Sequence, residues 1–131
     1  MPVESNTLAQ HHRHCDALFA AAREAASADD ADALTACVSA LRDAVLAHFR
    51  YEEQHIFPLY EQSSGIAGAT EWLRAEHDDM RGTFWMLGTV SPEADWRYYR
   101  AELAALQSAF DKHAAEEESR MYPIFERLLR A

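Results

Sequence analysis

His48–Glu61 reads HFRYEEQHIFPLYE, and a histidine, a glutamate and a late proline define its frame. His48 and Glu52 lie four residues apart, which on an α-helix is about 400° of rotation and about 6 Å of rise. One helix face therefore carries an imidazole and a carboxylate, one turn apart. The frame returns as HAAEEESRMYPIFE at His113–Glu126, 65 residues later (113 − 48). Two copies of the frame indicate a shared role for the histidine and the glutamate.

The same shift relates the sequences that precede the two frames. His12 overlays His77, and the neighbours of His12 follow: Leu8 overlays Leu73, Cys15 overlays Met80 and Phe19 overlays Phe84. The shift is also about half of the 131 residues. The repeat predicts a duplicated helical hairpin, with pseudo-repeats at 1–65 and 66–131. Each copy would supply one histidine from its first helix and a histidine–glutamate pair from its second.

The composition predicts a single acidic, helical domain over residues 1–131. Only four glycines and four prolines interrupt a chain rich in alanine, leucine, glutamate and arginine, which favours helices over strands. A net charge of −10 argues against nucleic acids and anionic membranes as partners. No apolar run approaches the roughly 20 residues that span a bilayer, and the first residues do not resemble a signal peptide. With only two cysteines, Cys15 and Cys37, a reduced cytoplasmic setting is expected.

Capping signals and hydrophobic periodicity predict four long helices. The first is expected from Thr7, which forms a capping box with Gln10, to about Ala26. The second helix is expected from an N-cap at Asp29 or Asp30 to a kink or end at Pro58, and the third from Thr70 to 87. The fourth is expected to begin at Ser91-Pro92-Glu93 and to continue past Glu117. A last helical piece is expected at Ile124–Leu129. Short joins predict an all-α, antiparallel up-down-up-down four-helix bundle with a short C-terminal helical extension.

The repeat selects four imidazoles and two carboxylates on the inward stripes of these helices: His12, His48, Glu52, His77, His113 and Glu117. A single core histidine is usually hydrogen-bonded to a neighbour, and a helical glutamate usually faces water. Two buried carboxylates without a cation, however, would each cost several kcal/mol, so the set indicates metal binding. The other histidines overlay different residue types and are expected to be solvated: His11 overlays Glu76, His14 overlays Asp79 and His55 overlays Arg120.

For six residues that flank the predicted ligands, two interpretations are open: each either has a role near the metals or simply packs in the core or lies at the surface. They are Cys15, Asp16, Arg81, Tyr51, Tyr60 and Tyr122. For Cys15 a buried filler is favoured over a redox-active thiol. Glu53 and Glu118 are repeated too, but they lie about 100° from the ligand face of the helix. Surface ion pairs are therefore favoured for these two glutamates.

Nitrogen and oxygen donors without a thiolate suit iron, manganese or zinc. Two glutamates from different helices can each bridge two metals, while two histidines hold each metal. Helix-bundle cores with carboxylate-bridged metal pairs usually contain iron. The predicted cofactor is therefore two iron ions with a bridging oxo or hydroxo group, in preference to manganese or zinc.

The chain resembles the hemerythrin-like, HHE cation-binding domains over nearly its whole length. The residues that carry the resemblance are His12, His48-x-x-x-Glu52, His77 and His113-x-x-x-Glu117, followed by the tails Ile56-Phe57-Pro58 and Met121-Tyr122-Pro123. The resemblance implies a four-helix bundle with a non-haem diiron centre. It also implies an oxygen-linked role, such as O₂ binding, redox sensing, nitric oxide or peroxide handling, or iron homeostasis.

Two positions depart from the pattern of the oxygen-carrying hemerythrins. Those proteins have a further histidine one turn from the third-helix ligand, whereas Leu73 and Arg81 lie four residues from His77 here. Their last motif ends in an aspartate five residues after its histidine, whereas Glu117 follows His113 by four. The metal at His77 and His113 is thus expected to be more open, which favours reactivity over simple oxygen carriage.

The leading functional hypothesis is a diiron protein that binds O₂ or a related small molecule, such as peroxide or nitric oxide, as a sensor, store or scavenger. A diiron enzyme that reduces peroxide or nitric oxide is the alternative, together with an iron storage or sensing module. The sequence also leaves open whether the chain forms a homo-oligomer or acts with a separate signalling partner.

Overall fold

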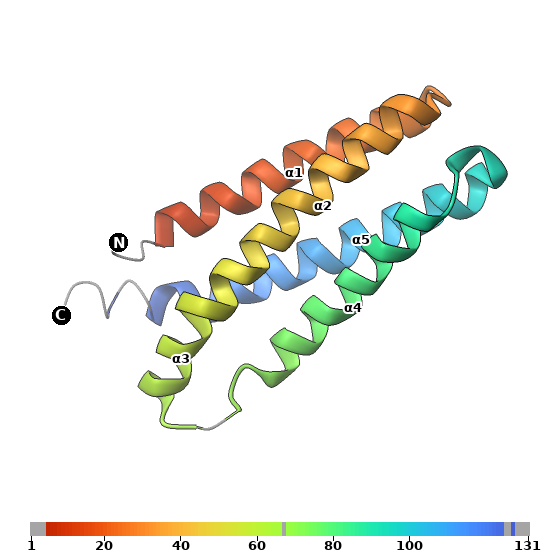
Figure 1. Cartoon of the computed structure of the whole chain (residues 1–131). Coiled ribbons are helices and arrows are strands. Elements are labelled where there is room, and N and C mark those ends of the chain that lie inside the picture. Colours follow the sequence, from red (N-terminus) through yellow and green to blue (C-terminus); the bar gives the residue numbers. More distant parts are fainter. Residues whose placement is uncertain (1–4, 67, 125–126, 128–131) are drawn as a thin grey trace.

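The computed structural model describes residues 5–66, 68–124 and 127, and these residues form an almost entirely helical chain (Figure 1). The long helices are α1 (Ser5–Ser27), α2 (Ala31–Tyr51), α4 (Glu71–Thr89) and α5 (Trp96–Glu116). Shorter elements are the π-helical segments η1 (Glu52–Ile56) and η3 (Glu117–Met121), the helix α3 (Phe57–Ser64) and the 3-10 turn η2 (Pro92–Ala94). The described ranges contain no strand. The predicted all-α four-helix bundle is confirmed.

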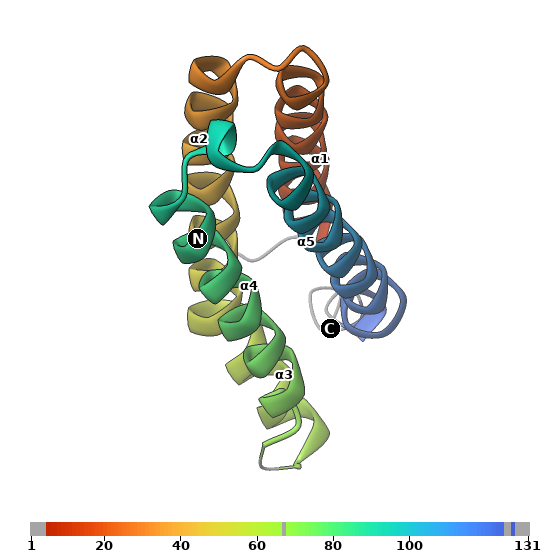
Figure 2. The same ribbon diagram turned by 90° about the vertical axis from the view of Figure 1, so that its right-hand side faces the viewer.

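The four long helices surround one core. α2 packs against α1 and α4, and α5 packs against the same two helices (Figure 2). The ribbon turns back between successive long helices (Figure 1). As a result, the start of α1 and the start of α4 lie at the same end of the bundle as η1 and η3. The predicted ligands are carried by these parts of the chain and by the adjoining ends of α2 and α5.

The inward stripes predicted from the sequence are buried. The buried apolar side chains form a large cluster through the middle and one end of the bundle: Cys15, Phe19, Ala22, Ala25, Ala26, Leu34, Val38, Leu41, Val45, Phe49, Met80, Phe84, Leu87, Tyr99, Leu103, Leu106, Phe110 and Ala114. A smaller apolar cluster lies at the other end: Leu8, Ile56, Phe57, Leu73, Met121 and Tyr122. On α5, Tyr99 enters the core, while Trp96 is only partly buried.

Of the four predicted helix starts, those at Asp30 and Thr70 are confirmed, and those of the first and the fourth long helix are wrong. Asp30 is the N-cap of α2, where its carboxylate accepts a hydrogen bond from the Ala33 amide at 3.1 Å, and Thr70 precedes α4 as its N-cap. Thr7, in contrast, lies inside α1, which already includes Ser5. Each residue added to an existing helix gains a hydrogen bond, so a capping sequence within a helical run does not have to begin the helix.

The fourth long helix begins later than predicted. Ser91-Pro92-Glu93 leads into only the 3-10 turn, and the Ser91 side chain makes no capping hydrogen bond there. Asp95 instead caps α5, because its carboxylate accepts a hydrogen bond from the Tyr98 amide at 3.0 Å. A charged acceptor immediately before the helical run is the stronger cap.

Helical structure does not end at Pro58, since α3 continues to Ser64. Gly65 then ends α3 with a φ of 71°, a left-handed conformation that glycine adopts without steric cost. The predicted C-terminal piece at Ile124–Leu129 falls mostly outside the described residues. Among the helices that are described, none is long and apolar enough to cross a membrane.

Candidate metal centre

The six predicted ligands meet between the large and the small apolar cluster. Each is 0–3% exposed: His12, His48, Glu52, His77, His113 and Glu117. α1 and α4 each supply one histidine. α2 with η1, and α5 with η3, each supply a histidine and a glutamate. Both halves of the chain therefore contribute the same residue types from equivalent helices.

Both glutamates begin a π-helical segment. In each segment the amide five residues further on donates to the glutamate's main-chain oxygen, from Phe57 to Glu52 and from Tyr122 to Glu117. The next residue is a proline, Pro58 or Pro123, which lacks an amide hydrogen and would clash with the carbonyl four residues before it in a regular α-helix. The wider π turn makes room for this ring. Such turns are frequent at functional sites, and here each one starts at a candidate ligand.

The donor atoms form two groups of four that share both glutamates. Within each group they lie within 4.8 Å of one another: position A is His12, His48, Glu52 and Glu117, and position B is Glu52, His77, His113 and Glu117. Each glutamate contacts one histidine of each position through the histidine Nε2. Glu52 Oε1 lies 3.2 Å from His48 and 3.5 Å from His77. Glu117 Oε1 lies 3.2 Å from His113 and 3.5 Å from His12.

Several donor atoms that face this space have no hydrogen-bond partner among the described residues. They are both carboxylate oxygens of Glu52, both of Glu117, and Nε2 of His48. Burying a carboxylate in this way costs several kcal/mol, and a bound cation would offset that cost. Imidazole nitrogens with carboxylate oxygens suit a transition metal. The six side chains therefore fit a metal site with two positions.

The charge states of these side chains also suit a metal. Burial opposes ionisation of Glu52, but the attraction of the nearby imidazoles of His48 and His77 outweighs it and lowers the pKa to about 2. Burial, helped by repulsion from His77, lowers the pKa of His113 below its ordinary value. At neutral pH the carboxylate is thus charged and the imidazole is neutral, which are the forms that bind metals.

Three of the four histidines direct Nδ1 at a glutamate. The Nδ1–Oε distances are 3.0 Å for His12 and Glu118, 2.8 Å for His77 and Glu53, and 2.9 Å for His113 and Glu76. An Nδ1–H that donates to a carboxylate leaves the Nε2 lone pair free for a metal and makes the imidazole a better ligand. The predicted surface ion pairs of Glu53 and Glu118 are therefore contacts to candidate ligands. Their rotation away from the ligand face directs them toward the histidine of a neighbouring helix.

The fourth histidine has a different partner. His48 Nδ1 lies 3.0 Å from Nδ1 of His11, and His11 overlays Glu76 in the repeat. Donation from His48 Nδ1 requires a neutral His11 ring that accepts the hydrogen bond. Burial, together with repulsion from His48 and His12, lowers the pKa of His11 and favours that neutral form. The prediction that His11 is merely solvated is therefore wrong.

Arg81 extends one of these contacts. Its guanidinium lies 2.7 Å from Glu53 Oε1, while the other oxygen of Glu53 faces His77. The Glu53 carboxylate thus connects a surface arginine to a buried histidine. Of the two interpretations that the sequence left open for Arg81, these contacts favour a role near the site over a purely surface one.

His14, His55 and Cys15 belong to neither donor group. His14 and His55 are exposed. His55 packs against Tyr51, with ring centroids 5.0 Å apart. Burial, with the carboxylates of Asp16 and Glu52 nearby, raises the pKa of Cys15 to about 12, so the side chain is a protonated thiol in the large cluster.

The structure separates Tyr122 from the other tyrosines that the sequence left equivalent. Its hydroxyl lies 3.1 Å from His12 Nε2, and its ring stacks on the His12 ring at 5.7 Å with an interplanar angle of 25°. Phe57 occupies the equivalent place and stacks on His77 at 5.3 Å and 26°. Burial and the nearby carboxylates of Glu52 and Glu118 raise the pKa of Tyr122, so the phenol keeps its proton.

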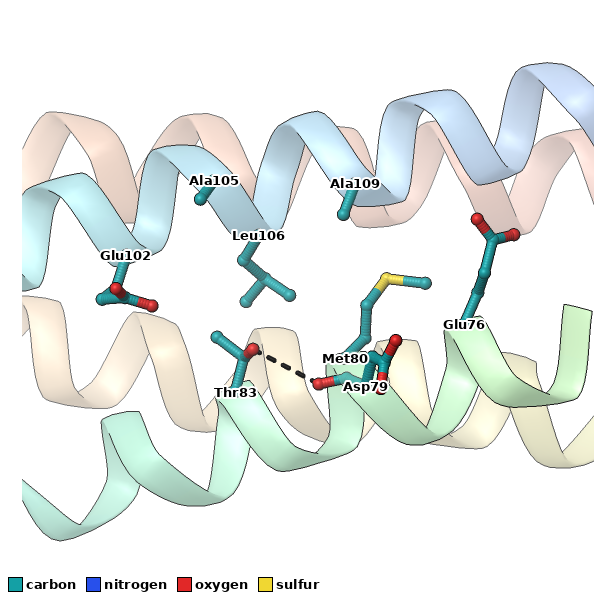
Figure 3. Close-up of a pocket in the computed structure, with 8 residues that line it drawn as sticks. All are labelled: Glu76, Asp79, Met80, Thr83, Glu102, Ala105, Leu106 and Ala109. Carbon is teal, nitrogen blue, oxygen red and sulfur yellow. Dashed lines mark hydrogen bonds between the residues drawn. The ribbon is translucent and has the colours of Figure 1, made fainter. Parts of the chain in front are cut away.

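Two hollows at equivalent places lie beside the site. The hollow between α4 and α5 has a volume of about 180 Å³, and Figure 3 shows Met80 on α4 directed toward Leu106 and Ala109 on α5. The hollow between α1 and α2 has about 240 Å³ and includes His48 itself. The repeat relates four pairs of lining residues: Glu76 and His11, Asp79 and His14, Met80 and Cys15, and Ala109 and Ala44. Acidic side chains therefore line the hollow at position B, and imidazoles line the one at position A.

The comparisons with known proteins agree with this geometry. The family model described as the Hemerythrin HHE cation binding domain matches residues 3–125. No curated protein and no solved structure matches the chain significantly. The matched range contains all six buried donors, and it covers most of the 131 residues. The chain therefore belongs to the hemerythrin HHE cation-binding domain family.

Proposed function

We propose that the chain binds two iron ions, one at position A and one at position B, joined by a bridging oxo or hydroxo group. The protein ligands in this proposal are His12, His48, Glu52, His77, His113 and Glu117. The observation that carries it is that Glu52 and Glu117 belong to both positions, and that their fully buried carboxylates have no hydrogen-bond partner among the residues that the structure describes. A carboxylate shared by two donor groups has the placement of a bridge between two ions.

Iron is favoured by the donor chemistry. Each position offers two imidazoles and two shared carboxylates, and helix-bundle cores with carboxylate-bridged metal pairs usually hold iron. Thiolates would favour other metals, but the Cys15 side chain is a protonated thiol outside both donor groups. Manganese and zinc can use the same donors and are distinguished by direct metal analysis.

We further propose that the iron-loaded protein binds O₂ or a related small molecule, in sensing, storage or scavenging. Four protein donors at each position leave coordination sites for such a molecule, and bound iron supplies a redox-active centre for it. Aromatic rings shield the donors from water: Phe49 stacks on His77 at 3.8 Å and 8°, and Phe57 stacks nearby. The small apolar cluster, which includes Leu8 and Leu73, closes the end of the site.

Metal analysis combined with an electronic spectrum in the presence of azide tests the proposal. Protein produced without added zinc should contain two iron ions per chain, and azide should change the visible absorption of the oxidised form. A reversible, stoichiometric spectral change on adding O₂ supports binding. Fewer than two metals per chain, with no azide-sensitive absorption, would contradict the diiron assignment. Catalytic consumption of peroxide or nitric oxide would replace the binding role by an enzymatic one.

A further inference from the structure

Tyr122 carries a buried hydroxyl at position A that the six predicted ligands do not include. The side chain is 5% exposed, and its hydroxyl lies 3.1 Å from Nε2 of His12. His12 Nδ1 already faces Glu118 at 3.0 Å, so Nδ1 is the nitrogen that carries the hydrogen. Nε2 is then an acceptor, and the Tyr122 hydroxyl donates to it.

Metal binding at position A would remove this acceptor. His12 Nε2 faces Glu117 Oε1 at 3.5 Å, while Nδ1 faces Glu118, so Nε2 is the nitrogen available to a metal at position A. A nitrogen whose lone pair binds a metal cannot accept a hydrogen bond. A buried hydroxyl left without an acceptor is costly. Two kinds of acceptor then remain for Tyr122: the Glu117 carboxylate, whose Oε1 lies 3.5 Å from the same Nε2, and a small molecule bound to the metal at position A.

The two positions differ in this respect. At position B the residue equivalent to Tyr122 is Phe57, whose ring stacks on His77 but carries no hydroxyl. The two tyrosines beside the small apolar cluster, Tyr51 and Tyr60, make no hydrogen bond to any of the six donors within the described residues. Position A is therefore the one with a phenol directed at its coordination space.

We propose that Tyr122 donates a hydrogen bond to the small anionic or partly reduced molecule that binds the metal at position A, and that it thereby favours binding at position A over position B. The proposal rests on the proposed diiron function. It identifies Tyr122 as a binding residue beyond the metal ligands. It also assigns the ligand a chemical class, a small molecule with an acceptor atom close to the metal.

The test compares Tyr122→Phe with the wild-type chain, both loaded with iron and oxidised, by titration with azide. Phenylalanine keeps the ring that stacks on His12, and Phe57 shows that the equivalent place accepts this side chain. Loss of one hydrogen bond to a charged acceptor should weaken azide binding about tenfold or more. Tyr60→Phe is the matched control, because it removes a phenol that packs against the same cluster, and its azide affinity should equal that of the wild type.

Iron content and the unfolding midpoint of each variant separate the possible outcomes. A Tyr122→Phe protein with two iron ions and unchanged azide affinity would overturn the proposal, since the hydroxyl would then serve Glu117 only. An equal loss in Tyr60→Phe would also overturn it, because the effect would come from the cluster. A phenolate-to-iron absorption band in the wild type that disappears in Tyr122→Phe would replace hydrogen bonding by direct ligation. Failure of the wild type to bind two iron ions would instead refute the proposed function itself.

Discussion

Replacing Glu52 by glutamine should remove both metals, whereas replacing His12 by alanine should remove one. Glu52 belongs to both donor groups, so the loss of its charge weakens both positions at once. His12 belongs to position A only, and its removal leaves all four donors of position B: Glu52, His77, His113 and Glu117. The two variants therefore distinguish a shared bridge from a terminal ligand.

The size of the effect follows from linkage between binding and folding. A metal present at 100 times its dissociation constant stabilises the folded state by about 2.7 kcal/mol per site, or about 5 kcal/mol for two independent sites. For a domain of this length, that stabilisation corresponds to a rise of roughly 15 °C in the melting temperature. His12→Ala should keep about half of this rise. Glu52→Gln should keep almost none of it.

The assay measures melting temperature and metal content with and without Fe²⁺ under anaerobic conditions. Glu24→Gln is the control, because Glu24 is exposed on α1 and its charge is remote from both donor groups; it should behave as the wild type. Two metals and a full melting shift in Glu52→Gln would refute the bridging role of this residue. Loss of both metals in His12→Ala would refute the separation of position B from position A.

Three further predictions concern the surroundings of the ligands. His55→Ala should retain both metals, because His55 is exposed and contacts Tyr51; a metal lost in this variant would show that the ligand set is incomplete. Glu76→Ala should weaken metal binding at position B about 10- to 100-fold, since Glu76 accepts a hydrogen bond from His113 and orients its ring. Asp79→Ala, in the same hollow, should leave metal binding unchanged. Equal losses of metal affinity in the two variants would exclude an orienting role for Glu76. In the metal-free protein, the free energy of unfolding should fall as the pH drops below 6.5 and again as it drops below 4.5. These are the ordinary pKa values of histidine and glutamate, and in the folded state the pKa values of His113 and Glu52 lie below them. The unfolded chain therefore takes up these protons first, which favours unfolding. Denaturant titrations between pH 8 and pH 3 measure this, and a stability that rises on acidification would contradict it.

Periodicity and the internal repeat were sufficient to predict the helices, because local sequence carries that information. The inward stripes are buried as expected, from Leu8 to Phe19 on α1 and from Leu34 to Val45 on α2. Helix ends were less predictable, since several capping sequences compete. Ser91 and Asp95 could both begin the fourth helix, and only the second makes the capping hydrogen bond.

The convergence of the six buried side chains was predictable because the repeat preserves them, but their hydrogen-bond partners come from other helices. Glu118 reaches His12 from η3, and Glu53 reaches His77 from η1. Spacing along one helix cannot reveal such contacts. A signal was nevertheless present, since the repeat conserves both glutamates within the chain, and an acid repeated beside each ligand motif is a candidate partner for a histidine.

The repeat makes the two positions alike in their ligands and unlike in what surrounds them. Each has two histidines and the same two glutamates, so the ligands alone give no reason for the two metals to behave differently. Their surroundings supply that reason. Position B has a carboxylate behind both of its histidines, whereas at position A His48 is backed by the neutral ring of His11. A carboxylate partner makes an imidazole a stronger donor, so position B should hold its metal more tightly. Position A combines the weaker donor with the Tyr122 hydroxyl, and a molecule bound there would accept the hydrogen bond that we propose for Tyr122. The repeat thus gives the two positions equivalent donors, and the unequal residues at equivalent places make their surroundings chemically different.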